Sequence, residues 1–223
     1  EPWSYLKSPY PKAVGWKGFV DGKESGVYAA SPLSRLNVAD RLATPGAQEE
    51  FERFYETLGS GKAKGRYRPV HHRLATHWAR LVELLYAAER MLELAEDPEI
   101  VSTELRTPAG TITGRGIGCV EAPRGTLTHH YETDERGVLT RVNLIVGTTN
   151  NYAPMTMSIR KAAQSLITGG KIVEEGMLNR IEMAFRLYDP CLSCATHAAV
   201  GKMPLRIAIR NAAGELVRTV SRD

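Results

Sequence analysis

Two of the three cysteines and one of the six histidines fall within nine residues near the C-terminus. The run from Asp189 to His197 reads DPCLSCATH, with two residues between Cys191 and Cys194. Two thiolates at this spacing can turn toward one metal ion, and thiolate is a soft ligand that suits nickel, copper(I), zinc or iron. The nearby Asp189 carboxylate can accept a hydrogen bond or a proton. We therefore treat this loop as the chemical centre of the chain.

Three interpretations of the cysteine pair compete on chemistry alone. A thioredoxin-like redox motif would place the pair before a helix, whereas here we expect it after one. A structural zinc site needs four ligands, and Cys191, Cys194 and His197 supply three. Cys119 could be the fourth, although a lone cysteine in a strand is more often a small buried hydrophobe. In the third interpretation the remaining ligands come from another segment or chain. The residues alone leave the zinc site and the half-site open.

Length and composition exclude several classes of protein. The chain has 223 residues, of which 43% are hydrophobic and 24% charged, and this is enough for one or two domains with a real core. The net charge of +4 is spread along the chain rather than gathered in a basic arm. We expect no nucleic-acid partner, no membrane span, no signal peptide and no secreted disulfide framework. These features favour a cytoplasmic location.

The elements that must position the loop begin with helices. The first thirty residues are rich in turns, with at most a short hairpin near Asp21-Gly22. Ser31 is placed to cap a first helix, and a second is expected over 47–58, followed by a flexible basic loop over 59–65. A long helix is predicted from about Val70 to Glu96. Its apolar residues fall at three- and four-residue spacings and predict one core-facing stripe: Leu74, Trp78, Leu81, Val82, Leu85, Ala88, Leu92 and Ala95.

The pattern then changes to short extended runs between turn signals, which predict a small antiparallel sheet over 111–113, 116–120, 126–131 and 138–146. Two more helices are expected over 155–167 and 173–188. Pro190 ends the second, so the cysteine loop should follow a helix. Alternating residues over 205–210 and 216–220 predict a final hairpin. The fold class is α+β, mainly long packed helices with a small antiparallel sheet and a C-terminal β-hairpin tail.

Three motifs together point to a family. DPCLSCATH closely resembles the C-terminal motif of nickel–iron hydrogenase large (catalytic) subunits. The EAPRGTL run at 121–127 and the NLIVGTTNN run at 143–151 resemble two further motifs of that family, in the expected order. Ser31 to Arg35 is a looser match, with Ser31 where the family usually has Gly. The NLIVGTTNN sequence and the hairpin tail are most similar to those of the cytoplasmic NAD(P)-linked bidirectional type.

The departures from the family pattern concern the N-terminal side. The family has a second CxxC pair there, which completes four thiolates for nickel, and this chain lacks it. The resemblance therefore implies that 1–197 is the C-terminal portion of a large subunit. It also implies that 198–223 is an extension that a maturation protease removes after His197.

The resemblance implies a role for each motif residue. Cys191 would bind nickel as a terminal thiolate and accept a proton, and Cys194 would bridge nickel and iron. Arg124 would project its permanently charged guanidinium toward the open metal position and the cyanide ligands of the iron. Pro123 would line the same pocket. Thr148, or its neighbour Thr149, would donate its hydroxyl to a cyanide.

Two residues have more than one expected role. Asp189 would orient Arg124 or hold a proton, although an Asp before Pro is also a plain helix stop. His197 would mark the cleavage point and ligate magnesium or a similar ion. The catalytic set is thus Arg124, Asp189 and Cys191, the cofactor-binding set adds Pro123 and Thr148, and the metal ligands are Cys191, Cys194 and His197.

The resemblance also implies an enzyme of several subunits. Its nickel–iron centre would carry CN and CO ligands on iron, and dihydrogen would be split heterolytically and reversibly. Electrons would pass to iron–sulfur clusters in a small subunit and to flavin and NAD(P) in diaphorase subunits. Other partners would be the N-terminal half, a maturation chaperone and an endopeptidase. The alternatives are a non-catalytic metal-binding or assembly module and a hydrogenase-like subunit of an energy-converting respiratory complex.

Overall fold

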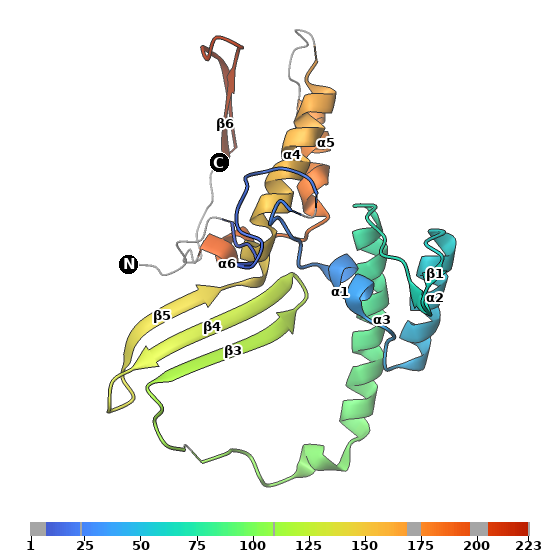
Figure 1. The fold of residues 1–223 in the computed structure, drawn as a ribbon, viewed down its shortest axis with the longest axis vertical. Coiled ribbons are helices and arrows are strands. Elements are labelled where there is room, and N and C mark those ends of the chain that lie inside the picture. Colours follow the sequence, from blue (N-terminus) through green and yellow to red (C-terminus); the bar gives the residue numbers. More distant parts are fainter. Residues whose placement is uncertain (1–7, 23, 109, 169–174, 197–204, 223) are drawn as a thin grey trace.

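The computed structural model describes residues 8–22, 24–108, 110–168, 175–196 and 205–222. Figure 1 shows three groups of elements: helices α1 to α3, a three-stranded sheet, and the pair of helices α4 and α5. The short helix α6 lies where the sheet and the helix pair meet. The α+β class expected from the sequence is confirmed. No helix in the described part of the chain is long and apolar enough to cross a membrane.

The first group begins with α1 (Pro32–Val38) and α2 (Pro45–Thr57). Ser31 caps α1 as predicted, since its Oγ accepts the Ser34 N–H. The cap of α2 comes from a different helix: the Glu89 carboxylate accepts the N–H groups of Gly46 and Ala47, each at 2.9 Å. A carboxylate at a helix N-terminus pairs with otherwise unbonded donors and with the positive end of the helix dipole.

The loop after α2 is partly ordered into strands. The expected flexible segment 59–65 contributes β1 (Lys62–Ala63), which pairs with β2 (Arg66–Tyr67) in a short hairpin. The expectation of a shapeless loop was therefore wrong. Gly65 sits in the turn at φ +81°, a conformation that glycine adopts without strain.

The long helix α3 (Ala75–Glu96) begins five residues later than predicted. The reason lies at Val70, whose N–H and C=O both bond to the side chain of Asn37 instead of joining the helix. Helices α1 and α2 pack on α3 around the buried residues Leu33, Leu36, Phe51, Phe54, Tyr55, Val70, Ala75, Ala79 and Val82. Truncating an aromatic residue in such a core costs about 3–5 kcal/mol.

The described chain covers only part of the predicted apolar stripe of α3. Val82 from the stripe is buried and Trp78 packs against the same core, together with the small residues Ala75 and Ala79. Leu74, Leu81 and Leu92 are each more than 60% exposed. Periodicity reveals an apolar face but not how much of it another element covers.

The sheet is an antiparallel meander of β3 (Arg115–Ala122), β4 (Gly125–Thr133) and β5 (Leu139–Ile145). Residues 111–113, expected as a further extended run, form no strand. A 3₁₀ turn over Pro98–Val101 leads from α3 toward the sheet. Ala122 pairs directly with Gly125, so Pro123 and Arg124 are the two residues of the β3–β4 turn. This register places the EAPRG motif at the tip of a hairpin.

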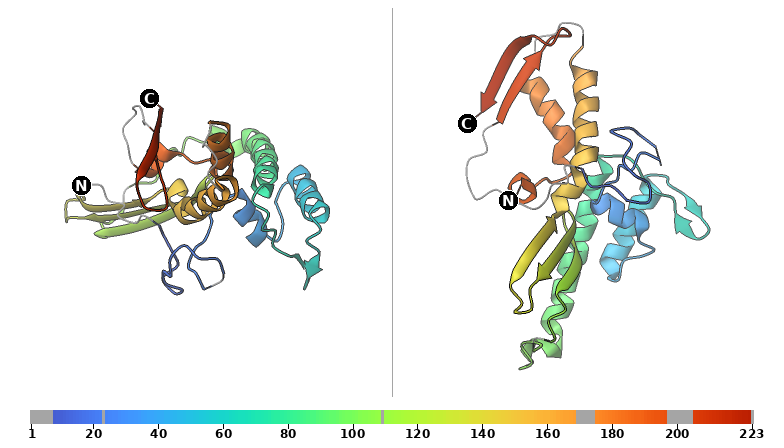
Figure 2. Two further views of the ribbon diagram at one scale, coloured as in Figure 1. Left: turned by 90° about the horizontal axis from the view of Figure 1, so that it is seen from above. Right: turned by 60° about the vertical axis from the view of Figure 1, so that its left-hand side comes forward.

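The last group follows β5 through the 3₁₀ helix η2 (Gly147–Asn151) into α4 (Tyr152–Leu166). Helix α5 (Glu175–Arg186) lies alongside α4, as the right-hand view of Figure 2 shows. After α5 come α6 (Leu192–Thr196) and the hairpin of β6 (Leu205–Arg210) and β7 (Leu216–Arg222), close to the predicted boundaries. No strand forms in residues 8–22 and 24–30, so the hairpin expected near Asp21-Gly22 is absent there.

Candidate metal-binding site

The floor of the candidate site is η2, a polar sequence that is nonetheless buried. Thr148, Thr149, Asn150 and Asn151 are all at most 6% exposed. This segment is pressed against the β3–β4 turn: a Cβ on Gly125, which has φ +146°, would lie 2.4 Å from the Gly147 carbonyl oxygen. Only glycine fits there. The close approach joins the EAPRG and GTTNN motifs into one surface.

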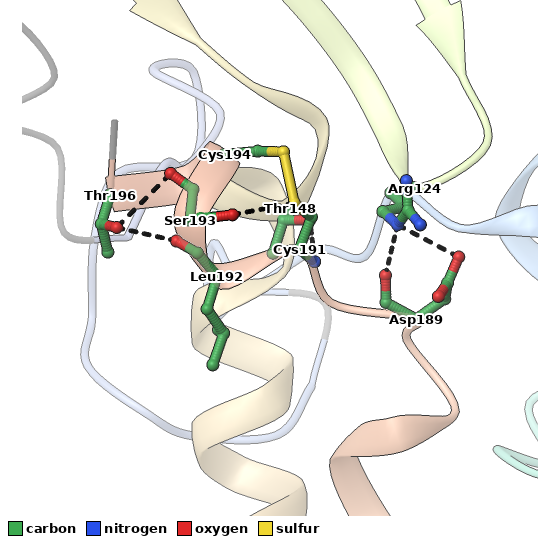
Figure 3. The surroundings of a disulfide bond; sticks show 8 residues. All are labelled: Arg124, Thr148, Asp189, Cys191, Leu192, Ser193, Cys194 and Thr196. Atoms are coloured by element: carbon green, nitrogen blue, oxygen red, sulfur yellow. Dashed lines mark hydrogen bonds and ion pairs between the residues drawn. A yellow bond between two sulfur atoms is a disulfide. The ribbon is translucent and has the colours of Figure 1, made fainter. Parts of the chain in front are cut away.

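The cysteine pair lies against η2. The Cys191 N–H donates to the Thr148 hydroxyl at 3.1 Å (Figure 3). The two cysteines form a disulfide, with their Cα atoms 5.4 Å apart. Before them, Asp189 has φ +50°, a left-handed conformation that turns the chain sharply after α5. The two sulfur atoms therefore lie next to each other, beside η2.

The expected relation of the pair to the neighbouring helices was only half right. The pair does follow α5, but Cys191 also opens α6, since the Ala195 N–H donates to the Cys191 carbonyl at 3.1 Å. The cysteine pair is therefore followed by a helix, as in a thioredoxin-like redox motif, contrary to the expectation from the sequence. Helix α6 has five residues, too few to sum a large dipole at its N-terminus.

Arg124 reaches the same segment from the hairpin tip. Its Nε donates to the Asp189 main-chain oxygen at 2.8 Å and lies 3.1 Å from the Asp189 carboxylate (Figure 3). Both side chains are about two-fifths exposed, so the ion pair itself contributes little stability, roughly 0–1 kcal/mol. Among the described residues no other acceptor takes a hydrogen bond from this guanidinium, so its two terminal nitrogens remain free to bind an anion.

The base of the loop is anchored to α3 and α4. Arg73 donates to the Tyr188 hydroxyl at 2.7 Å, and the Ser158 hydroxyl lies 3.1 Å from the same oxygen. Arg80 donates to the Leu187 carbonyl at 2.7 Å. Burial raises the pKa of Tyr188, against the smaller lowering effects of Ser158 and Arg73. The phenol therefore stays protonated at neutral pH and holds this network together.

Two buried asparagines contribute in a way that the sequence did not assign. The Asn150 side-chain nitrogen donates to the Thr126 carbonyl at 2.7 Å, and its oxygen accepts the Tyr28 hydroxyl at 2.5 Å. Asn151 bonds with its side chain to Ala30 and to Arg124. The sequence signal that could have identified them is the Asn150-Asn151 pair between an expected strand and an expected helix, because buried polar groups require hydrogen-bond partners.

The sequence-predicted residues that the structure brings together are Arg124, Asp189, Cys191, Cys194 and Thr148 (Figure 3). Pro123 is beside Arg124 in the turn and is exposed. His197, expected to ligate an ion, lies outside the described residues. Cys119 is a free, exposed thiol in β3, with its sulfur 3.4 Å from the Thr128 hydroxyl. The interpretation of Cys119 as a small buried hydrophobe was therefore wrong.

The residues present fit one side of a thiolate metal centre. Once the Cys191–Cys194 disulfide is reduced, two soft thiolate donors lie next to each other, and the Arg124 guanidinium is bonded to Asp189, two residues before Cys191. The Thr149 hydroxyl is buried without a hydrogen-bond partner among the described residues. Burial raises the pKa of the nearby Tyr152 phenol, and the Thr149 hydroxyl lowers it by less. No group of three His, Cys, Asp or Glu side chains in the described ranges is arranged to hold a metal. A zinc site completed by Cys119 is thus unsupported among the described residues.

Comparison with known proteins gives the class. The sequence profile of the nickel-dependent hydrogenase family matches residues 23–197. The chain belongs to this family, and the resemblance drawn from its motifs is confirmed.

Two relatives and one solved structure show how far the similarity extends. The chain is 50% identical over 98% of its length to an iron-sulfur subunit of the F420-non-reducing hydrogenase from Archaeoglobus profundus, of which it spans 43%. It is 46% identical over 97% of its length to the beta subunit of the NAD-reducing hydrogenase HoxS from Cupriavidus necator, of which it spans 42%. The crystal structure of an NAD+-reducing [NiFe]-hydrogenase in the H2-reduced state superposes with a TM-score of 0.72 at 42% identity, over 88% of this chain and 40% of that one. The chain thus spans less than half the length of these relatives.

Proposed function

We propose that this chain forms the C-terminal part of the catalytic large subunit of a nickel–iron hydrogenase that cleaves dihydrogen reversibly in the cytoplasm. The observation that carries the proposal is the convergence of Thr148 and Arg124, from two other segments, on the loop that carries Asp189 and the Cys191–Cys194 pair. The similarity to hydrogenase subunits over nearly the whole chain supports the same conclusion.

Cys191 and Cys194 would be the ligands that this chain supplies to the nickel–iron centre. When bound, that centre provides the electrophilic metals at which dihydrogen is split heterolytically. Two thiolates are a partial set, so the remaining ligands would come from the N-terminal portion of the large subunit. The Thr148 hydroxyl fixes the backbone of Cys191 by accepting its N–H, and its own proton stays available for a further acceptor such as a cyanide.

Arg124 would stand over the metal position with the terminal nitrogens of its guanidinium free to donate to anionic ligands. A guanidinium suits this role because it stays charged and carries several donors in a fixed plane. Asp189 orients it by binding Nε through both the main chain and the carboxylate. In the proposed proton transfer, the Cys191 thiolate would accept the proton while the bound centre takes the hydride, and the Asp189 carboxylate would be the next proton acceptor toward solvent.

The extension 198–223 would be cut off after His197 during maturation, and the side chain of His197 would then ligate magnesium or a similar ion. Among the residues that the structure describes, β6 and β7 of this extension pair only with each other. An isolated two-stranded hairpin is at best marginally stable by itself, so its removal would break no sheet shared with the rest of the chain. Proposed partners are a small subunit with iron–sulfur clusters, diaphorase subunits with flavin and NAD(P), a chaperone and an endopeptidase.

The test is to produce the chain with the N-terminal portion of the large subunit and the maturation machinery. We expect nickel and iron together, a mass reduced by the 198–223 segment, and hydrogen-dependent dye reduction. Cys191→Ser should abolish nickel retention and activity, whereas the control Cys119→Ser should retain both. Zinc alone with the extension intact would favour the metal-binding or assembly module. Metal loading without hydrogen chemistry would favour the same module, whereas the intact cysteine pair already argues against a hydrogenase-like subunit of a respiratory complex.

A further inference from the structure

We propose that Arg35 and Asn151 are positioning residues for Arg124, because together they hold three consecutive carbonyl groups of the β3–β4 turn. This inference rests on the proposed function and assigns residues that act on the arginine rather than on the substrate. Neither residue touches the cysteine pair. Both come from segments far from the turn in sequence.

Arg35, from α1, holds the first two carbonyls. Its two terminal nitrogens donate to the carbonyl oxygens of Ala122 at 2.9 Å and of Pro123 at 3.1 Å. The same side chain is braced from behind by Glu83 of α3, with two hydrogen bonds of 2.6 and 2.5 Å to the two carboxylate oxygens. The two side chains are only 18% and 22% exposed. A guanidinium that makes two parallel hydrogen bonds to one carboxylate, and is shielded from water, has a fixed orientation.

Asn151 holds the third carbonyl. Its side-chain nitrogen donates to the main-chain oxygen of Arg124 at 2.8 Å. The same nitrogen donates to the Ala30 carbonyl, and its oxygen accepts the Ala30 N–H, at 3.0 and 2.9 Å. Asn151 is 1% exposed, and its amide uses both donors and its acceptor. It cannot turn away without leaving buried polar groups unpaired, which is costly.

The consequence for Arg124 follows from the geometry of the turn. A two-residue hairpin tip is an exposed loop, and such tips open easily when few bonds hold them. Here the carbonyls of Ala122, Pro123 and Arg124 are all tied to side chains of other segments, and Gly125 is pressed against the backbone. With the backbone fixed on both sides, the Cα–Cβ direction of Arg124 is fixed as well. The contacts of Nε with Asp189 then fix the orientation of the Arg124 side chain.

The residue at 35 must be arginine for this arrangement. Three different nitrogens of one guanidinium are in use, and they span two carbonyls on one side and a carboxylate on the other. A lysine ammonium has its donors at one point and cannot reach both carbonyls while paired with Glu83. Arg35→Lys therefore keeps the charge and the ion pair with Glu83 but loses the hold on the turn.

The first measurement is amide hydrogen exchange of the segment around Arg124 in the assembled large subunit. We expect Arg35→Lys to raise exchange at Arg124 and Gly125 by about tenfold, because the turn opens more often. The matched control is Arg53→Lys, since Arg53 also pairs with two carboxylates but on the surface of α2. If Arg35→Lys does not fold, Glu83→Gln removes the charge of the brace and should raise exchange at the same amides. Unchanged exchange in whichever variant folds would overturn the proposal.

The second measurement uses kinetics. Arg35→Lys should lower kcat about tenfold with nickel content and KM unchanged, since a displaced catalytic group loses its alignment. In a double variant with Arg124→Lys, the loss should be no greater than for Arg124→Lys alone, because Arg35 acts through Arg124. Losses that multiply would overturn the proposal. A wild-type enzyme without hydrogen chemistry would refute the proposed function instead, and hydrogen exchange would still decide whether Arg35 holds the turn.

Discussion

The Thr148 hydroxyl accepts the N–H of Cys191 at 3.1 Å, although 43 residues separate the two in the chain. This one bond joins the buried η2 segment to the cysteine loop. It also satisfies the N–H of the residue that precedes α6, a donor that no helix can bond within itself. The position of the cysteine pair therefore depends on a threonine that lies in another motif.

Thr148→Val tests this dependence. Valine has the same shape but cannot accept the Cys191 N–H, and losing such a half-buried hydrogen bond costs about 1 kcal/mol. We expect a lower Tm and a several-fold loss of nickel retention in the assembled protein, and Thr148→Ser should restore most of both. Thr156→Val is the control, since Thr156 bonds only to the Tyr152 carbonyl one turn back on the exposed side of α4. Equal effects of the two valine variants would contradict the role of Thr148.

Arg124→Lys separates charge from geometry. Lysine keeps the positive charge but lacks the planar fork that can hold Asp189 with one nitrogen and an anion with the others. Removing such a donor from a catalytic site typically lowers kcat by about 10²–10³-fold. Nickel content and Tm should stay close to wild type, because the side chain is half exposed. The control is Arg136→Lys, an equivalent exposed arginine that pairs with Asp134 in the β4–β5 turn, and its kcat should not change.

Local patterns predicted the elements well where local chemistry decides them. Ser31-Pro32 marked the start of α1, Pro190 marked the end of the region around α5, and alternation marked β3 to β7. The cysteine spacing correctly placed two sulfurs together. Each of these signals lies within a few residues of the feature that it predicts.

The failures with the largest consequence for the fold and the site concern contacts between distant segments. The whole apolar stripe of α3 was expected in the core, but its period does not show that α1 and α2 would leave Leu74, Leu81 and Leu92 exposed. Val70 left the helix for the side chain of Asn37, thirty-three residues away. Asn151 and Arg35 hold the turn of Arg124 from two other segments. No sequence period encodes such partners, so these residues emerge only from the folded structure.

Gly125→Ala tests the close contact between the two central motifs. A Cβ would lie 2.4 Å from the Gly147 carbonyl oxygen and 3.0 Å from that of Ala30, and the backbone at φ +146° disfavours any side chain. Backbone strain alone costs roughly 1–3 kcal/mol. We expect a clear fall in Tm together with loss of metal binding, because the turn must move off η2. Gly118→Ala is the control: it lies in the adjacent strand with nothing within 4 Å of the added methyl, and it should behave as wild type.

Glu89 makes the packing of α2 on α3 sensitive to acid. The nearby Thr44 hydroxyl and the N–H groups of Ala47 and Gly46 lower the pKa of this carboxyl below its ordinary value of 4.5, and burial opposes them without reversing the direction. The Thr44 hydroxyl lies close to the carboxylate but is not hydrogen-bonded to it. A lowered folded-state pKa stabilises the protein above the unfolded value, and this is lost as pH falls through the folded value. The Tm of the wild-type protein should therefore decrease as the pH drops below about 4.5. Glu89→Gln should start lower at pH 7 and converge with wild type in acid, whereas Glu52→Gln, on the outer surface of α2, should follow the wild-type curve.

Metal removal should change the state of the cysteine pair. Cys191 and Cys194 are close enough to form a disulfide with each other, whereas Cys119 is a free thiol on the sheet. Bound thiolates are protected from oxidation because their electron pairs are engaged by the metal, whereas a free vicinal pair oxidises readily. After chelation in air, we expect peptide mass spectrometry to find Cys191 joined to Cys194 and Cys119 still open to alkylation. In the metal-loaded protein the link should be absent, and a reductant should restore nickel uptake to the oxidised sample. A link that forms equally fast with and without metal would mean that these sulfurs are not its ligands.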